Sequence, residues 1–197
     1  MSWLNLAAQV SCTEAEGPGR RAAIWVQGCD KRCPGCCNPG YLRIQSQDVV
    51  TASAVLEWLA MVQQRESIEG VTFLGGEPLL QAKGLAVVAS GAQALGLSVM
   101  IFSGYTLAEV HELAPAGAEE LLASTDVLVD GAYDATQPEI LRNWVGSRNQ
   151  HFHYLSERYD AQIETTGARL RTQEWRVTAN GAVKVNGWPE PVRLVRP

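Results

Sequence analysis

The sequence predicts an α/β fold with a parallel sheet, followed by a small antiparallel β appendage. Strand-like apolar runs alternate with helical apolar patterns through the first two-thirds of the chain. Such alternation is typical of βαβ units, whose strands are parallel and whose crossovers are right-handed. Near the C-terminus, residues 174–186 (EWRVTANGAVKVN) alternate around Asn180-Gly181, which is the strongest short-range signal for a β-hairpin. We therefore predict an α/β core over residues 1–150 and a β-hairpin appendage over residues 151–197.

Each element of the core follows from its own apolar pattern. The first clear strand, residues 22–27 (AAIWVQ), is a nearly continuous apolar run. Helical spacing marks residues 51–65, where apolar residues from Val55 to Val62 fall on one face. Gly96 is expected to end a helix in the left-handed conformation. The predicted strands cover residues 22–27, 71–74, 97–102 and 127–129, and the predicted helices cover residues 51–65, 82–95 and 107–123, the last broken near Pro115.

The composition favours a compact protein that is not secreted. Apolar residues make up 46% of the 197 residues and charged residues 19%, which is enough for a sizeable core. The net charge of −5 argues against binding to nucleic acid or to an anionic membrane, since both need a basic excess. Met1–Val10 has no signal-peptide pattern, and the uncharged residues 84–108 are interrupted by glycines and polar residues. We therefore expect a soluble, cytoplasmic protein without a membrane span.

Every predicted strand is followed by a polar or glycine-rich segment. Residues 28–37 follow the first strand, residues 75–78 (GGEP) the second, residues 103–106 (SGYT) the third, and Asp130-Gly131 the fourth. The carboxyl ends of parallel strands meet at one edge of a sheet, where α/β proteins place their active sites. The four segments are therefore expected to form one composite site.

The cysteine-rich segment is the most specific feature of the sequence. Four of the five cysteines lie close together, and Cys29, Cys33 and Cys36 have the spacing C-x3-C-x2-C. Three thiolates on a looping backbone can bind three corners of a cubane iron–sulfur cluster, whereas an electron-transfer cluster normally has four cysteine ligands. The fourth iron is then open to another ligand. A zinc site or a four-cysteine cluster completed by Cys12 or Cys37 is one alternative, and cysteines without a metal are another.

Together these segments resemble the radical S-adenosylmethionine (SAM) superfamily, and within it the anaerobic ribonucleotide reductase activating proteins and related glycyl-radical enzyme activases. The cysteine motif followed by Gly-Gly-Glu-Pro carries the resemblance to the superfamily. The similarity to the activases covers about residues 12–150. The segments that carry it are EGPGR at 16–20, QGC at 27–29, CPGC at 33–36, NP at 38–39, GGEPL at 75–79, SGYT at 103–106, VDG at 129–131 and GSRNQ at 146–150.

The resemblance implies a partial (β/α)6 barrel, related to the TIM barrel, that holds a [4Fe-4S] cluster on Cys29, Cys33 and Cys36. SAM would bind the open iron, and its reductive cleavage would give methionine and a 5′-deoxyadenosyl radical. In activases this radical takes a hydrogen atom from a backbone glycine of a partner, here a ribonucleotide reductase-like glycyl-radical enzyme. Two other classes stay open, namely a self-standing radical SAM enzyme that modifies a small molecule or peptide and a non-enzymatic iron–sulfur module.

The glycine-rich segment after the second strand is expected to bind SAM. Glu77 is a carboxylate that could accept hydrogen bonds from the SAM amino group. Gly75 and Gly76 would let the backbone approach the ligand closely. Gly35, inside the cysteine motif, is assigned to the same cofactor-binding set.

Three further strand-end residues are candidates for the same pocket. Ser103 and Tyr105 would line it, although an aromatic side chain in a loop could equally pack on the protein. Asp130 would hold a cation or the SAM ribose, or else cap a helix. His151 and His153 would share one face of a strand, but the sequence shows no third metal ligand beside them.

The charge distribution suggests a protein partner for the cysteine segment. Residues 20–43 contain Arg20, Arg21, Lys31, Arg32 and Arg43 against a single acidic residue, while the rest of the chain is acidic. A basic rim around a reducible cluster would suit an acidic electron donor such as a flavodoxin or a ferredoxin. Ordinary solvated loop charge is the alternative.

Overall fold

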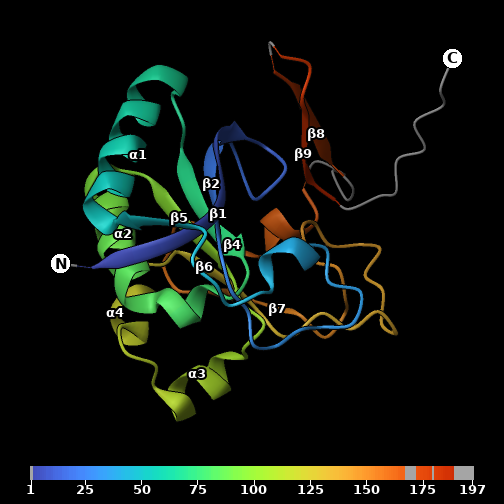
Figure 1. Cartoon of the computed structure of the whole chain (residues 1–197). Coiled ribbons are helices and arrows are strands. Elements are labelled where there is room, and N and C mark those ends of the chain that lie inside the picture. Colours follow the sequence, from blue (N-terminus) through green and yellow to red (C-terminus); the bar gives the residue numbers. More distant parts are fainter. Residues whose placement is uncertain (1, 167–171, 179, 189–197) are drawn as a thin grey trace, which may run out of the picture.

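The structure is a computed structural model that describes residues 2–166, 172–178 and 180–188 of the chain. It has a mixed α/β fold with a seven-stranded sheet and a separate two-stranded sheet (Figure 1). The large sheet has the order β3-β1-β2-β4-β5-β6-β7. Its strands are β1 (Trp3–Thr13), β2 (Arg21–Val26), β3 (Asp48–Thr51), β4 (Gly70–Gly75), β5 (Ser98–Phe102), β6 (Val127–Asp130) and β7 (His151–Tyr154). The helices are α1 (Ala52–Glu66), α2 (Ala82–Ala94), α3 (Leu107–Leu113) and α4 (Ala118–Ala123), with short 3-10 turns at Pro39–Tyr41, Pro78–Gln81 and Ala161–Glu164.

The centre of the large sheet is parallel, as the sequence predicted. β2, β4, β5 and β6 pair parallel to one another, whereas β1, β3 and β7 pair antiparallel. Helical crossovers connect the four parallel strands in turn. The resemblance implied six βα units, but the described residues contain four parallel strands in a sheet with edge strands β3 and β7.

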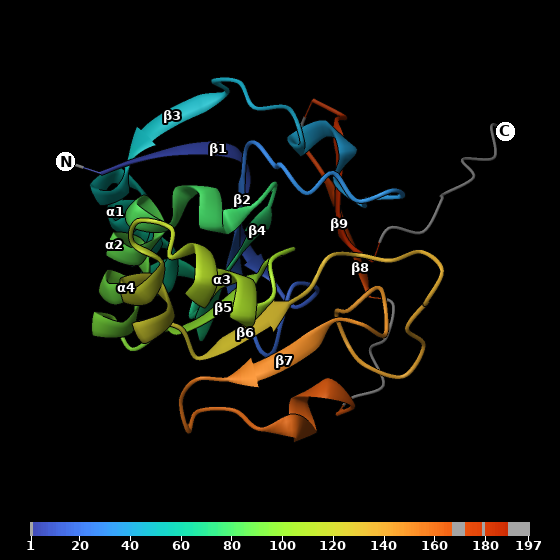
Figure 2. The ribbon, with the colours of Figure 1, turned by 90° about the horizontal axis from the view of Figure 1, so that it is seen from below.

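The two faces of the large sheet have different surroundings. Helices α1, α2 and α4 lie together on one face (Figure 2), where Leu59, Leu85 and Leu121 belong to the same buried cluster as Phe73 and Ile101 of the strands. On the opposite face a smaller cluster contains Trp25 and Leu74 with side chains from β1, the 3-10 turn at Pro39–Tyr41 and β5. The helices therefore bury one face, and the other is left to form a site.

The helix ends follow their predicted signals. The Thr51 hydroxyl accepts a hydrogen bond from the Ala54 N–H at 3.1 Å and caps α1. Gly96 follows α2 in the left-handed region with φ +81°, as expected. Thr106 and Glu109 form a capping box at the start of α3, which pairs two otherwise unsatisfied N–H groups. The predicted break near Pro115 is confirmed, because it separates α3 from α4.

Two strands of the large sheet were not recognised in the sequence, and a third was assigned to the appendage. β1 and β3 precede and follow the first predicted strand, and they pair antiparallel with each other. They are invisible to a search for βαβ units because no helix connects β1 to β2. β7 starts where we placed the appendage, yet it pairs with β6 from Asp130↔His151 to Val127↔Tyr154. The core sheet therefore extends to Tyr154, while the division into two units at residue 151 stays a prediction.

The C-terminal hairpin is confirmed. β8 (Gln173–Val177) and β9 (Val183–Gly187) pair antiparallel, with Trp175 opposite Val185 and Val177 opposite Val183. The hairpin lies beside the turn between β1 and β2, since Arg176 Nη2 donates to the Cys12 carbonyl at 2.7 Å. Within the described ranges, no helix is long and apolar enough to cross a membrane.

Candidate functional site

A cavity of about 1010 Å³ lies on the face of the sheet that the helices leave free. Trp25, Leu74 and Phe102 of the parallel strands line it, together with residues of the cysteine segment and of the hairpin. Eight of the ten residues assigned to the site from the sequence line this cavity. They are Cys29, Cys33, Gly35, Cys36, Gly75, Gly76, Glu77 and Ser103.

Hydrogen bonds join the four strand-end segments into one unit. The Gly76 N–H donates to the Val26 carbonyl and the Glu77 N–H to the Gly28 carbonyl, both at 2.8 Å, so the second segment is bound to the first. The Ser103 N–H donates to the Val129 carbonyl at 2.9 Å and links the third segment to β6. The strand ends therefore form one composite site, as their common edge of the sheet predicted.

The cysteine segment is a closed loop at the carboxyl end of β2. The Gly28 N–H donates to the Tyr41 carbonyl at 2.8 Å, and the Cys29 N–H donates to the Leu42 carbonyl at 3.1 Å. Inside the loop, the Cys36 N–H donates to the Cys33 carbonyl at 3.1 Å, and Gly35 takes the left-handed conformation with φ +79°. A residue with a Cβ is strained in this conformation, which explains a glycine between the two cysteines.

The five cysteines differ in position and in chemistry. All are free thiols, and Cys12 packs against the helix-covered core instead of lining the cavity. Cys37 lines the cavity with the motif cysteines. A hydrogen bond with Cys37 lowers the pKa of the Cys36 thiol to about 6, and the same bond raises the pKa of Cys37. Burial raises the pKa of Cys29. The structure thus removes Cys12 from the set of possible ligands.

Glu77 is a buried carboxylate at the floor of the site. Its side chain is 1% exposed. Oε1 accepts from the Leu79 N–H and the Ser103 hydroxyl, both at 2.9 Å, and Oε2 accepts from the Gly104 N–H at 2.8 Å. Burial raises the pKa of Glu77 to about 7. Glu77 therefore connects the second segment to the third, while its carboxylate still borders the cavity.

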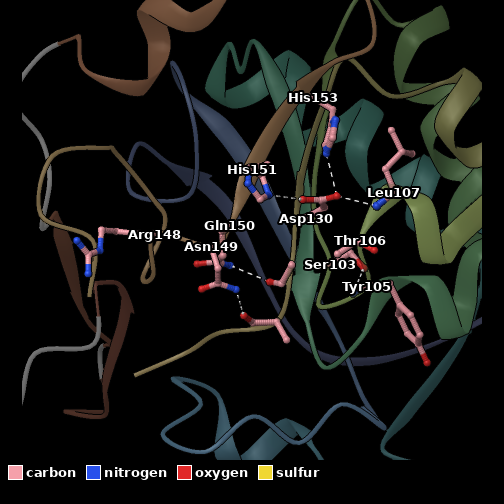
Figure 3. A network of polar contacts seen from close by, with 12 residues as sticks. Ser103, Tyr105, Thr106, Leu107, Asp130, Arg148, Asn149, Gln150, His151 and His153 are labelled. Atoms are coloured by element: carbon pink, nitrogen blue, oxygen red, sulfur yellow. Dashed lines mark hydrogen bonds and ion pairs between the residues drawn. The ribbon is translucent and has the colours of Figure 1, made fainter. Parts of the chain in front are cut away.

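Tyr105 and Asp130 do not line the cavity in the described part of the chain. The Tyr105 hydroxyl donates to Asp30, and the Lys31 ammonium lies 3.8 Å from the centre of the Tyr105 ring. Tyr105 thus packs on the outside of the cysteine segment. Asp130 Oδ2 accepts from the Leu107 N–H at 2.6 Å and lies 2.8 Å from His153 Nε2 (Figure 3). Asp130, at the end of β6, therefore caps the first N–H of α3. Helix capping was the alternative to binding a cation or the SAM ribose.

Several lining residues were missed in the sequence. Tyr133, Trp144 and Gln150 border the cavity from the segment between β6 and β7. Gln150 Oε1 accepts from the Gly146 N–H at 2.9 Å. Gln150, labelled in Figure 3, also donates from Nε2 to the Gly131 carbonyl at 3.3 Å. The GSRNQ segment therefore fixes the loop after β6. Resemblance pointed to this segment, but no local pattern assigned it a structural role.

The proposed basic rim is wrong in two of its five residues. Arg20 and Arg21 precede β2, whereas the cysteine segment follows the carboxyl end of the strand. The Arg21 guanidinium is buried, where it donates to the Thr72 hydroxyl at 2.6 Å and to the Val71 carbonyl at 3.0 Å. Residues adjacent in sequence are thus separated by the length of a strand, about 20 Å at 3.3 Å per residue. Lys31 is near the cysteines, but its charge is paired with Glu109 at 2.9 Å.

Comparison with known proteins places this site in a family. Residues 15–153 match the family described as "4Fe-4S single cluster domain". The chain belongs to this family. The anaerobic ribonucleoside-triphosphate reductase-activating protein of enterobacteria phage T4 is 29% identical over 71% of this chain and 86% of its own length. The protein of the same name from Vibrio cholerae is 31% identical over 70% of this chain and 89% of its own length. The pyruvate formate-lyase-activating enzyme of Clostridium pasteurianum is 32% identical over 58% of this chain and 46% of its own length.

The site fits the single cluster of the 4Fe-4S family. Four free thiols, those of Cys37 and of the three motif cysteines, border the same cavity. In a cubane each thiolate binds a different iron, so three cysteines spaced along one loop can supply the ligands. The thiol donors of this loop therefore fit the cluster named in the family description.

The fold itself requires the two glycines that precede Glu77. A Cβ on Gly76 would lie 2.2 Å from the Gly28 carbonyl oxygen, and a Cβ on Gly75 would lie 2.6 Å from the Val26 nitrogen. Gly75 also has a φ of +113°. The close approach shown here is to the chain's own backbone, in β2 for Gly75 and in the cysteine segment for Gly76. Both glycines also line the cavity, and their close approach to a ligand stays a prediction.

Gly76→Ala is expected to destabilise the protein by about 1–3 kcal/mol, as overpacking of a filled space does. The added methyl group collides with backbone, which cannot rotate away as a side chain can. Gly40→Ala is the matched control, because a Cβ at Gly40 meets nothing within 4 Å. Thermal unfolding of the metal-free proteins measures the difference. Equal stability of the two variants would contradict the close contact between the two segments.

Proposed function

We propose that the chain is a radical SAM activase that generates a glycyl radical on an anaerobic ribonucleoside-triphosphate reductase. Cys29, Cys33 and Cys36 would hold the [4Fe-4S] cluster, and the iron without a thiolate would bind SAM. When bound and reduced, the cluster supplies the electron that cleaves SAM to methionine and a 5′-deoxyadenosyl radical. The observation that carries the proposal is that the three cysteines of the C-x3-C-x2-C motif and a buried carboxylate border one cavity, in a chain whose relatives are named as activating proteins.

The residues of this chain would bind and orient SAM beside the thiols. Glu77 offers a carboxylate acceptor for the SAM amino group, and Ser103 holds one oxygen of that carboxylate in place at 2.9 Å. Trp25 and Phe102 give the cavity an apolar wall, which would exclude water from a reactive radical. The parallel strands would form the wall of the partial barrel that the resemblance implies. Asp130 and Tyr105 would act indirectly, by fixing α3 and the cysteine segment.

The cavity has the volume of a small-molecule site. Pockets for a single small ligand have volumes of about 300–1,000 Å³, and this cavity of about 1010 Å³ lies at the top of that range. It therefore has room for SAM beside the cysteine segment. In an activase, a backbone glycine of the partner enzyme would have to reach the cofactor in this cavity.

The electron would come from a small acidic redox protein such as a flavodoxin or a ferredoxin. Arg32 of the cysteine segment and Arg43, six residues after its end, support this proposal, since both are exposed. They are fewer than the five basic residues counted in the sequence, so steering by charge would be modest. A reduced cluster and thiolate ligands suit the cytoplasm, where we propose that the protein works.

Anaerobic reconstitution tests the proposed function. We expect about four irons and four sulfides per chain, as a single cubane requires. With dithionite and SAM, the reconstituted protein should release 5′-deoxyadenosine. With the reductase added, electron paramagnetic resonance should detect a glycyl radical. Stoichiometric zinc without iron would contradict the cluster, and 5′-deoxyadenosine without a glycyl radical would favour a self-standing enzyme.

A further inference from the structure

The C-terminal hairpin has two chemically different faces. Trp175, Val177, Val183 and Val185 are cross-strand partners and share one face, which we call the hairpin face. Their exposed fractions are 44%, 73%, 53% and 46%. These four adjacent side chains form a contiguous apolar patch on the two-stranded sheet. Contiguous apolar patches on soluble proteins mark interaction sites. The hairpin also lies outside residues 15–153, which match the 4Fe-4S family.

The opposite, polar face attaches the hairpin to the core. The Glu14 N–H donates to Glu174 Oε1 at 2.6 Å. Asn186 Nδ2 donates to Glu16 Oε1 at 3.0 Å, and the Gly187 N–H donates to the same oxygen at 2.7 Å. These bonds hold the hairpin against the end of β1. With the hairpin attached in this way, Val177 and Val183 stay 73% and 53% exposed.

The hairpin face continues the wall of the cavity. Trp175 and Val185 line the cavity that contains the cysteines, as do Arg176, Lys184 and Asn186 of the polar face. Val177 and Val183 lie beyond it in the described part of the chain. The apolar surface therefore leads from the cavity to the tip of the hairpin. A small molecule held among the cysteines would not contact Val177 or Val183, whereas a polypeptide entering the cavity would pass over them.

We propose that the hairpin face docks an extended, apolar segment of the partner reductase, next to the glycine that enters the cavity. This inference rests on the proposed function and adds to it the surface that receives the partner. Exposed valines and a tryptophan in register offer alternate side-chain contacts to an extended chain. The hairpin face thus contributes to affinity for the partner, while the cysteine segment and Glu77 serve the cofactor.

The test compares binding of the anaerobic ribonucleoside-triphosphate reductase from the same organism to wild-type and variant chains. The double variant Val177→Lys/Val183→Lys should raise the dissociation constant at least about tenfold, since it places two charges where apolar contact is expected. Val177→Thr/Val183→Thr keeps β-branched residues and the hairpin, and should weaken binding in the same direction by less. Val49→Lys is the matched control, because Val49 is 52% exposed on β3 and does not line the cavity.

The possible outcomes distinguish failure of the docking proposal from failure of the proposed function. If the reductase binds the wild-type chain and both hairpin variants with the same affinity, the hairpin face is not the docking surface. The proposed function is then unaffected. No binding and no glycyl radical with wild-type protein would overturn both. If the wild-type chain sediments as a dimer and the lysine variant as a monomer, the hairpin face binds a second copy of the chain. That result overturns the proposal. A loss of affinity confined to the hairpin variants, with unchanged thermal unfolding, supports it.

Discussion

Replacement of Cys29, Cys33 or Cys36 by alanine is expected to abolish release of 5′-deoxyadenosine from SAM. Each thiol borders the shared cavity on one closed loop. A cubane held by two thiolates is labile, so iron content should fall together with activity. The expected loss is at least about a thousandfold, which is the largest effect among our predictions. Iron and sulfide analysis and chromatographic detection of 5′-deoxyadenosine measure it.

The two other cysteines provide the controls for this experiment. Cys12 packs against the core and lies outside the cavity, so Cys12→Ala should keep the cluster and stay within about tenfold of wild-type activity. Cys37 lines the cavity beside Cys36. We expect Cys37→Ala to keep the cluster as well, and to change turnover of the partner more than uncoupled SAM cleavage. Iron lost in Cys37→Ala but kept in Cys29→Ala would show that the ligand set is wrong.

Glu77→Gln is expected to weaken SAM binding about ten- to hundredfold while the cluster remains. The charged acceptor is lost, and a charge-assisted hydrogen bond contributes on the order of 1.5–3 kcal/mol. The NH₂ group of the new amide also faces the N–H of either Leu79 or Gly104, so that two hydrogen-bond donors oppose each other. Glu120→Gln on the exposed side of α4 is the matched control. Titration calorimetry with SAM measures both, and equal affinities would remove Glu77 from the SAM site.

Comparison of the wild-type protein with Glu77→Gln isolates the contribution of Glu77 to the pH dependence of SAM binding. Burial raises the pKa of Glu77 to about 7. Below that pH the carboxyl group is protonated, and above it the anionic acceptor is present. Affinity for SAM should therefore rise through pH 7 in the wild-type protein. Protonation of SAM itself affects both proteins equally. In Glu77→Gln the affinity for SAM should therefore lack the part of the rise that Glu77 causes. Identical pH profiles would contradict this assignment.

The parallel core could be predicted because its signals are local and strong. Apolar runs became β2, β4, β5 and β6, and Gly96 and Pro115 ended helices where expected. β1 and β3 could not be predicted, since antiparallel pairing carries no βαβ signature. The composite site followed from topology alone: strand ends that are distant in sequence share one edge of the sheet. That rule brought the cysteine segment and the GGEP segment together correctly.

The roles of individual side chains were harder to predict than their neighbourhood. Gly76 and Glu77 were assigned to a ligand, but their first contacts are with the chain's own backbone. Tyr105 lies outside the cavity because its hydroxyl group is bound to Asp30. Arg20 and Arg21 were placed near the cysteines by sequence distance, although β2 separates them. Such contacts depend on which way each side chain points from its loop, and no sequence pattern encodes that direction.

Mössbauer spectroscopy of protein loaded with ⁵⁷Fe tests the central claim, that three thiolates leave one iron open for SAM. In the wild-type protein, addition of SAM should change the signal of about one iron in four, while the signals of the other three stay as they were. Glu77→Gln should need a higher SAM concentration for the same change. A spectrum that SAM leaves unchanged at saturating concentration would contradict the open site and the proposed function that rests on it.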